Sequence, residues 1–229
     1  MAASPENRIQ NWRDCQAFIR ADYHSRRGTR PIFEFLSDPI VRFLVVMRIL
    51  EWLENTGASQ LVRAPLTFWF RRLSLRLGFT ISRHVFGPGV ALPHYGNIMI
   101  DGRSSFGRNC RVHVGTVVAG TAKRMDPAEA SEWWAPIIGD NVYIAPGVKM
   151  NGPLSIADDC MISANSVVTR SFTTPGVTIS GFPANIVALS GSQNMIVRGC
   201  DRVPELSSSP RKDDVAAVKQ VRSSVLRES

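Results

Sequence analysis

The stretch IGDNVY IAPGVK MNGPLS IADDCM ISANSV V, residues 138–168, decides the fold, because an apolar residue opens every unit of six. The same period begins earlier, at residue 86, and is interrupted by a two-residue slip and by an insertion of about fifteen residues. The opening positions are Phe86, Leu92, Ile100, Phe106, Val112, Val118, Ile138, Ile144, Met150, Ile156, Ile162 and Val168. All of them are apolar in a chain whose apolar fraction is 44 %, so the period is a structural signal.

The six-residue period is neither that of an α-helix nor that of a simply alternating strand. It describes a short strand, a tight corner and another short strand, so three units close a triangular coil of about eighteen residues. The first and fifth positions then point inward, and successive coils stack at roughly 4.8 Å. The fourth position is often Gly or Asn, which tolerate the positive φ of a corner. These corner residues are Gly89, Asn109, Gly115, Asn141, Gly147 and Asn165.

Three regions differ in their composition: a helical region at 1–77, the repeat region at 78–190 and an extension at 191–229. In the first region, Asp38 and Pro39 form an N-cap and N1 pair, followed by apolar residues at helical spacing. Within the extension, residues 199–229 are polar and rich in Ser, Lys and Arg, which is typical of a loose tail. The sequence therefore predicts a mainly β protein with an N-terminal helical region.

The segment 61–77 combines an aromatic run at 68–70 with three arginines that follow it, Arg71, Arg72 and Arg76. Two interpretations stay open for it. The segment is a helix packed on the first coil, or it is a peripheral contact with an anionic membrane, where a basic amphipathic helix lies in the plane of the lipid surface.

Composition limits the class of protein. The four cysteines show no CxxC pair, which argues against a zinc site or a disulfide scaffold and is typical of a reducing cytosol. Two of them, Cys110 and Cys160, fall at inward positions and are expected in the core. The formal charge of +8 comes without a nucleic-acid motif, no secretory segment is recognisable, and charged residues interrupt the longest apolar stretch. We therefore expect a cytoplasmic protein, at most associated with the inner membrane face, without nucleic acid or metal.

Four stretches carry a resemblance to a known family: GPGVALPHYGNIMID (87–101), FGRNCRVHVGTVVAGT (106–121), PIIGDNVYIAPGVKM (136–150) and ISGFPANIV (179–187). The region resembles the hexapeptide-repeat acyltransferases, and within them the serine acetyltransferase branch and its relatives in exopolysaccharide and capsule clusters. The resemblance implies a left-handed parallel β-helix and a homotrimer. It also implies an acetyl-CoA site in the groove between neighbouring prisms.

Two histidines are the candidate catalytic residues. The resemblance matches His94 to the general base of the family, and the period places it at a corner, where an imidazole with an ordinary pKa near 6.5 suits proton abstraction. Counting units puts His113 one coil away on the same face, roughly 5 Å along the axis, where it has a direct role or lines the site. His24 and His84 are expected to be solvated.

The resemblance also assigns binding residues. The residues expected at acetyl-CoA are Gly120, Thr121, Lys123, Ala145, Ser163, Ala164, Gly181 and Pro183. Lys149 and Arg170 are cationic and outward-facing, so they are either contacts to the CoA phosphates or ordinary surface charges. The residues expected at the acceptor are Tyr95, Asp101, Trp133 and Trp134. A tryptophan pair beside a site can stack on a sugar ring or anchor a loop.

The sequence departs from the serine acetyltransferases at two positions. Thr80 stands where the family pairs its base with an aspartate, and Ala135 stands where it has a second histidine. Our leading expectation is therefore acetyl transfer to a hydroxyl of a sugar in glycan biosynthesis. Serine O-acetylation is the alternative enzyme, and a non-catalytic trimeric β-helix is the alternative from a different class.

Overall fold

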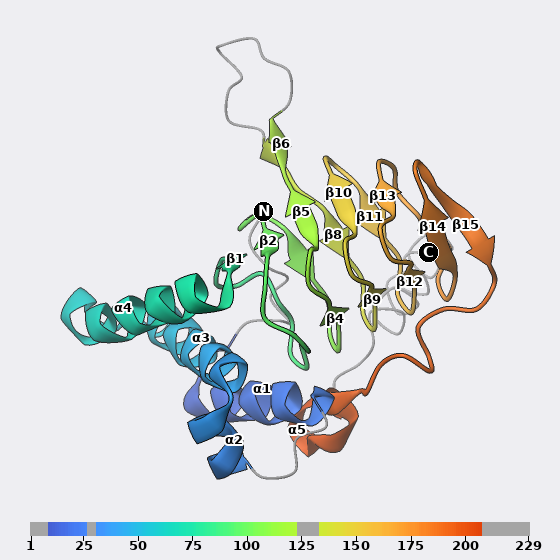
Figure 1. Ribbon diagram of the computed structural model, residues 1–229. Helices are drawn as coiled ribbons and strands as arrows, with labels where there is room; N and C mark the ends of the chain where they lie inside the picture. Colours follow the sequence, from blue (N-terminus) through green and yellow to red (C-terminus); the bar gives the residue numbers. More distant parts are fainter. Residues whose placement is uncertain (1–8, 27–30, 123–132, 208–229) are drawn as a thin grey trace, which may run out of the picture.

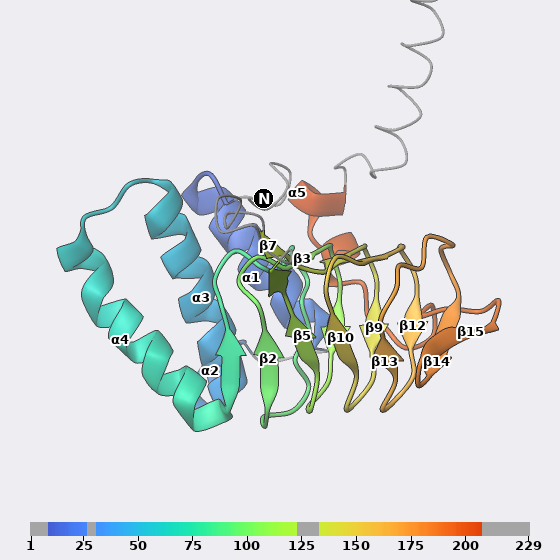
Figure 2. The same cartoon turned by 90° about the horizontal axis from the view of Figure 1, so that it is seen from above.

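The computed structural model describes residues 9–26, 31–122 and 133–207. Its strands are β1 (Phe79–Ile81), β2 (Ile98–Ile100), β3 (Ser105–Phe106), β4 (Arg111–Val112), β5 (Val117–Ala119), β6 (Thr121–Ala122), β7 (Trp133–Trp134), β8 (Ile137–Ile138), β9 (Tyr143–Ile144), β10 (Lys149–Asn151), β11 (Ser155–Ile156), β12 (Met161–Ile162), β13 (Val167–Val168), β14 (Thr178–Gly181) and β15 (Ala184–Ala188). They stack coil upon coil into a prism with helices at one end (Figure 1; Figure 2). Its three faces are the parallel ladders β1-β2-β5-β10-β13, β3-β8-β11 and β4-β9-β12-β14.

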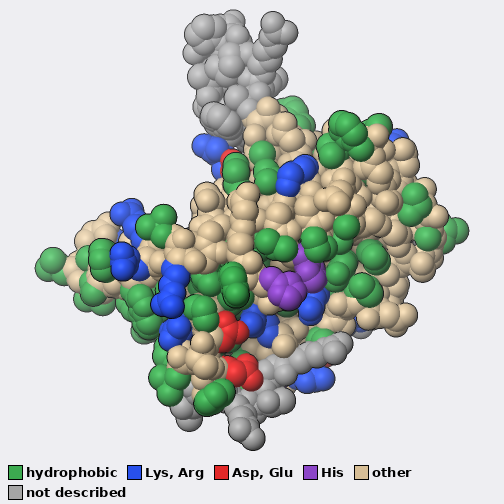
Figure 3. Space-filling model, in the orientation of Figure 1, with side chains coloured by type: hydrophobic (Ala, Val, Ile, Leu, Met, Phe, Trp, Pro, Cys, Tyr) green, Lys and Arg blue, Asp and Glu red, His purple; other side chains and the backbone are tan. Residues whose placement is uncertain are grey.

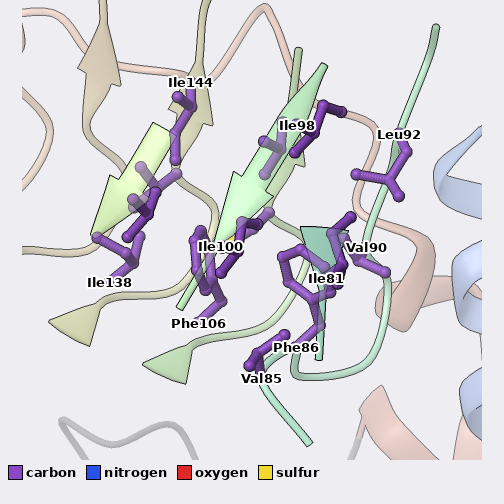
Figure 4. Close-up of a cluster of buried hydrophobic side chains, with 14 of the residues drawn as sticks. Ile81, Val85, Phe86, Val90, Leu92, Ile98, Ile100, Phe106, Ile138 and Ile144 are labelled. Carbon is purple, nitrogen blue, oxygen red and sulfur yellow. The ribbon is translucent and has the colours of Figure 1, made fainter. Parts of the chain in front are cut away.

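The core of the prism follows the six-residue period. All twelve opening residues are buried, each at most 3 % exposed. Residues one coil apart pair in register, as Ile100 does with Val118 and Ile144 with Ile162, so each face carries a column of inward apolar side chains. Figure 4 shows part of this core, including Phe86, Leu92 and Ile144. The parallel β-helix predicted from the period is therefore confirmed.

The corners of the coils have the backbone conformation that the sequence predicts. All six Gly and Asn corner residues named above have positive φ, and Asp159 joins them at φ 58°. Cys110 and Cys160 are fully buried at their inward positions, as expected. Since Asn and Asp bear this strain better than other L-residues, the repeat specifies where the chain turns as well as what it buries.

Four helices precede the prism: α1 (Trp12–Ser25), α2 (Pro31–Ser37), α3 (Pro39–Asn55) and α4 (Gln60–Leu77). Asp38 caps α3, because its side chain accepts a hydrogen bond from the amide of Ile40, and Pro39 opens the helix as predicted. Helix α4 ends at Gly78, which takes the left-handed conformation and leads directly into β1. Among the described residues, no helix is long and apolar enough to cross a membrane.

A buried ion network joins the helices to the first coil. The guanidinium of Arg48 is fully buried and lies 2.8 Å from Asp22 of α1 and 2.9 Å from Glu51 of α3. It also donates to the carbonyl oxygens of Phe86 and Gly87 in the first coil. Asp22 in turn accepts hydrogen bonds from the amides of residues 89 and 90. Together these bonds neutralise the buried charges and hold the first coil of the prism to helices α1 and α3.

His84, expected to be solvated, belongs to a neighbouring polar cluster. Its ring nitrogen lies 2.9 Å from the carboxylate of Glu54, and its amide donates to Glu51. Arg83 also pairs with Glu54. His84 is therefore half-buried and part of the junction between α3 and the first coil, which corrects the expectation.

The extension needs a second correction, because residues 199–207 are not part of a loose tail. They return along the prism and form a 3-10 helix, η3 (Gly199–Arg202), and a short helix, α5 (Pro204–Ser207), that pack on α1. The amide of Gly199 donates to the hydroxyl of Ser25, and the amide of Cys200 donates to the side chain of Asn109. Backbone hydrogen bonds fix this segment, which its polar composition does not reveal.

Candidate active site

The two candidate histidines lie side by side at one corner of the prism. His94 follows the first coil and is exposed, whereas His113 follows β4 in the next coil and is buried, at 8 % exposure. Their ring centroids are 5.9 Å apart. Histidine side chains are seen together on the face of the molecule that Figure 3 displays. The structure thus brings together the pair that the unit count predicts, with one ring open to solvent and one covered.

His113 is held by its neighbours. The Nε of Arg111 donates to Nε2 of His113 at 3.3 Å, so the neutral ring carries its proton on Nδ1. The ring of Tyr143, from the next coil, lies 5.0 Å away. The hydroxyl of Thr116 donates to the carbonyl of His113 and fixes the corner. Burial, together with the charges of Arg111 and His94, lowers the pKa of His113 to about 4.

These contacts separate the roles of the two rings. Because the pKa of His113 is far below neutrality, its ring stays neutral at pH 7 and is a weak base. Its fixed tautomer suits a residue that orients or donates a hydrogen bond. His94, which is exposed, is the ring of the pair that faces solvent.

A column of small residues rises from the histidine corner. Val112 pairs with Ile144 and Ile144 with Ile162, so Ala145 and Ser163, which follow them, stand one and two coils above His113. At the far end, the amide of Gly181 donates to the hydroxyl of Ser166 at 3.2 Å. Five predicted acetyl-CoA residues therefore share this region: Ala145, Ser163, Ala164, Gly181 and Pro183. A column without large side chains leaves the backbone open to a long, narrow ligand.

The remaining predicted residues gather at the other end of β5. Gly120 follows β5 directly and lies against the carboxylate of Asp101, while Thr121 pairs with Trp134 across the antiparallel β6–β7 hairpin. Trp134 is 42 % exposed. Asp101 accepts a hydrogen bond from the amide of Arg103, which closes its own turn.

Of the other predicted residues, Tyr95 adjoins the histidine corner and Trp133 adjoins the loop corner. Tyr95, beside His94, is 72 % exposed. The backbone of Trp133 is in β7, but its side chain is not described, and Lys123 lies outside the described residues. One chain therefore presents two candidate half-sites, the histidine corner and the loop corner, at opposite ends of β5.

Two residues of the site are absent from the sequence prediction, namely Arg111 and Tyr143. Both occupy the last position of their six-residue units. Their strands, β4 and β9, are neighbours, and Arg111 pairs directly with Tyr143. Outward positions carry no apolar requirement, so their residue types give no periodic signal. The register of the repeat could have predicted them, because it places both residues next to His113. Thr80 pairs with Met99 and not with the His94 corner.

The comparisons with known proteins agree with this architecture. Residues 135–170 match the family described as bacterial transferase hexapeptide (six repeats). Residues 135–170 therefore carry hexapeptide repeats, and the chain is similar to serine acetyltransferases. The hexapeptide-repeat chain is 27 % identical over 146 residues to the serine acetyltransferase of Mycobacterium tuberculosis, covering 62 % of this chain and 58 % of that relative. It is 31 % identical over 128 residues to that of Staphylococcus xylosus, covering 56 % and 54 %.

Solved structures share the fold. The serine acetyltransferase of Neisseria gonorrhoeae matches the hexapeptide-repeat chain with a TM-score of 0.60 at 23 % identity, over 80 % of this chain and 71 % of that one. The soybean apoenzyme matches with a TM-score of 0.59 at 21 % identity, over 76 % and 69 %. The expected left-handed β-helix with N-terminal helices is thereby confirmed. The chain spans little more than half the length of the curated relatives it matches.

The low pKa of His113 predicts a pH effect on stability. A histidine whose pKa falls from 6.5 in the unfolded chain to about 4 in the folded one stabilises the fold above pH 6.5 and loses that contribution toward pH 4. Between pH 7 and pH 5 the wild type should lose about 2 kcal/mol more than His113→Gln. Urea unfolding of both proteins at the two pH values measures the difference. Equal losses would mean that His113 titrates normally.

Proposed function

We propose that this chain is an acetyl-CoA-dependent O-acetyltransferase in which His94 is the general base. The observation that carries the proposal is the exposed His94 beside the neutral, oriented His113, at the foot of a column of small residues. The named relatives are acetyltransferases, and one solved structure of the same fold, with a TM-score of 0.56, is a serine acetyltransferase in complex with CoA. A purely structural β-helix has no need for an exposed histidine next to a buried one.

In this mechanism His94 takes the proton of the acceptor hydroxyl as its oxygen attacks the thioester carbonyl. His113 is held in position by its contact with Arg111 and keeps a proton on Nδ1 that it can donate. Backbone amides at the coil corner stabilise the oxyanion of the tetrahedral intermediate. The proton then passes from His94 to the leaving sulfur, so free CoA and the acetyl ester are the products. The cysteines Cys110 and Cys160 are buried, which fits direct transfer without an acyl-enzyme.

L-Serine is the acceptor that the relatives support best, since they are named serine acetyltransferases. This reverses the order of the two acceptors expected from the sequence. A sugar hydroxyl is the second candidate, because Ala135 occupies the place of the second histidine in the resemblance and the exposed Trp134 offers a stacking surface.

Release of CoA from acetyl-CoA, followed with L-serine and with a panel of mono- and oligosaccharides, tests the acceptor. Serine-dependent release that is unchanged by Trp134→Ala supports serine. Release only with a saccharide, and its loss in Trp134→Ala, would establish the sugar reading instead. If no acceptor gives release of CoA and acetyl-CoA does not bind, the acetyltransferase proposal is refuted and the non-catalytic β-helix becomes the better interpretation.

We further expect the protein to be a homotrimer. The two half-sites lie at opposite ends of β5, and a closed ring of three prisms brings the loop corner of one copy to the histidine corner of the next. Light scattering at micromolar concentration should give three times the mass of the chain, 25.3 kDa. An active monomer would refute both the trimer and the shared site.

A further inference from the structure

Helix α4 has two apolar sides. One side carries the buried Phe70, Leu73 and Leu77, which pack against α3 and β1. This confirms the interpretation of segment 61–77 as a helix packed on the first coil, but only for that side. The opposite side carries apolar residues that nothing in the described structure covers.

This outer face is defined by Leu61, Phe68 and Leu75, which are 88 %, 68 % and 81 % exposed. They are seven residues apart, close to two helical turns, so they lie in one line along the helix. A single exposed apolar residue is ordinary, whereas an aligned set on one helix marks a contact surface.

The outer face is framed by positive charge. Arg71, Arg72 and Arg76 are all exposed, and among the described residues none of the three takes part in an ion pair. The sequence of α4, QLVRAPLTFWFRRLSLRL, contains no Asp or Glu. In Figure 3, hydrophobic and basic side chains lie next to each other over the part of the molecule that Figure 1 labels α4. The outer face of α4 is therefore complementary to a partner with an anionic surface and an apolar interior.

Aromatic residues extend the face toward α2. Trp69 is 39 % exposed, and its ring meets Phe35 of α2 edge-on, with centroids 6.5 Å apart. Phe33 and Leu36 of α2 are 64 % and 67 % exposed. Tryptophan and phenylalanine at the border between apolar and charged groups are typical of side chains that sit at a lipid headgroup layer.

A second copy of the chain is a poorer occupant. A helix pair needs apolar residues at two positions of each heptad, but the positions between Leu61, Phe68 and Leu75 hold Pro65 and Arg72. Two copies meeting symmetrically would also bring like charges together, which destabilises the contact. An anionic surface instead pairs with the arginines and accepts the apolar side chains.

We propose that the outer face of α4 binds an anionic lipid surface, with the helix lying in the interface. Leu61, Phe68 and Leu75 enter the boundary between headgroups and acyl chains, while the arginine stems run along the surface to the lipid phosphates. The proposal is independent of the acetyltransferase reaction. It places the protein at a lipid surface, although none of its described helices can cross a membrane.

Co-sedimentation with vesicles tests the proposal. The wild type should pellet with phosphatidylcholine vesicles that contain a quarter phosphatidylglycerol, and much less with phosphatidylcholine alone. Removing one arginine from an anionic surface costs about fivefold in binding, so Arg72→Gln should lower the partition coefficient by about that factor. Phe68→Ser should lower it by at least about tenfold, through lost apolar burial.

Matched controls keep the test specific. Arg202→Gln removes the same charge from an exposed site on η3, and Leu189→Ser removes an apolar side chain that is 88 % exposed, like Leu61. Neither should change binding. The proposal is overturned if anionic lipid does not increase binding, or if the controls weaken it as much as the α4 variants. It is also overturned if Phe68→Ser reduces the mass of the assembly in light scattering, since a second copy then covers the face.

Discussion

Replacing His94 by alanine is expected to lower kcat for acetyl transfer by at least about 100-fold, the lower end of what removal of a general base costs. The physical reason is that His94 is the exposed ring of the pair, whereas the ring of His113 is covered, has a pKa of about 4 and accepts from Arg111. Steady-state kinetics with the acceptor that the CoA-release assay selects, and circular dichroism to confirm the fold, measure the effect.

His113→Ala is the matched variant on the neighbouring coil. Its loss should be smaller and shared between kcat and the KM of the acceptor, because an orienting group acts on binding as well as on the transition state. Acetyl-CoA affinity and the mass of the assembly should be nearly unchanged in both variants. If His113→Ala is the inactive protein and His94→Ala stays active, the two roles are exchanged.

Arg48→Met should give the largest loss of stability, about 3–5 kcal/mol in the free energy of unfolding. The substitution keeps the apolar volume but leaves Asp22 and Glu51 as buried carboxylates without their cation, and it removes the donors to Phe86 and Gly87. Equilibrium unfolding in urea at pH 7 measures the loss.

The control for this variant is Arg13→Met, in which the arginine side chain is 78 % exposed and lies 3.9 Å from Glu205. Its cost should stay below about 1 kcal/mol, as for other surface pairs. Should Arg48→Met be no more harmful than Arg13→Met, the ion network is not what joins the helices to the first coil.

The repeat region could be predicted because its signal is local and recurs. Each coil repeats the same pattern of inward and corner residues. Ile138 and Ile156 are therefore both predicted to be buried, and Asn141 and Asp159 are both predicted to lie at corners. The same counting places His94 and His113 next to each other, as the structure does. Regular stacking converts distance along the chain into position in space.

What the sequence could not predict depends on contacts that occur once. Arg48 looks like a charge interrupting an apolar helix, and only the fold brings Asp22 and the first coil around it. The extension looks loose because it is polar, yet its backbone binds Ser25 and Asn109. The division of the site into two corners was also hidden, because the family resemblance assigns residues without stating which of them share one chain's surface.

Binding of acetyl-CoA, measured by isothermal titration calorimetry, tests the central claim most directly because it needs no acceptor. We predict one site per chain, with an affinity that His94→Ala leaves nearly unchanged. Ala164→Trp should abolish binding by filling the column of small residues two coils above His113. Ala64→Trp, at an exposed alanine of α4, should bind like the wild type. No heat of binding in the wild type, or equal binding by Ala164→Trp, would contradict the account.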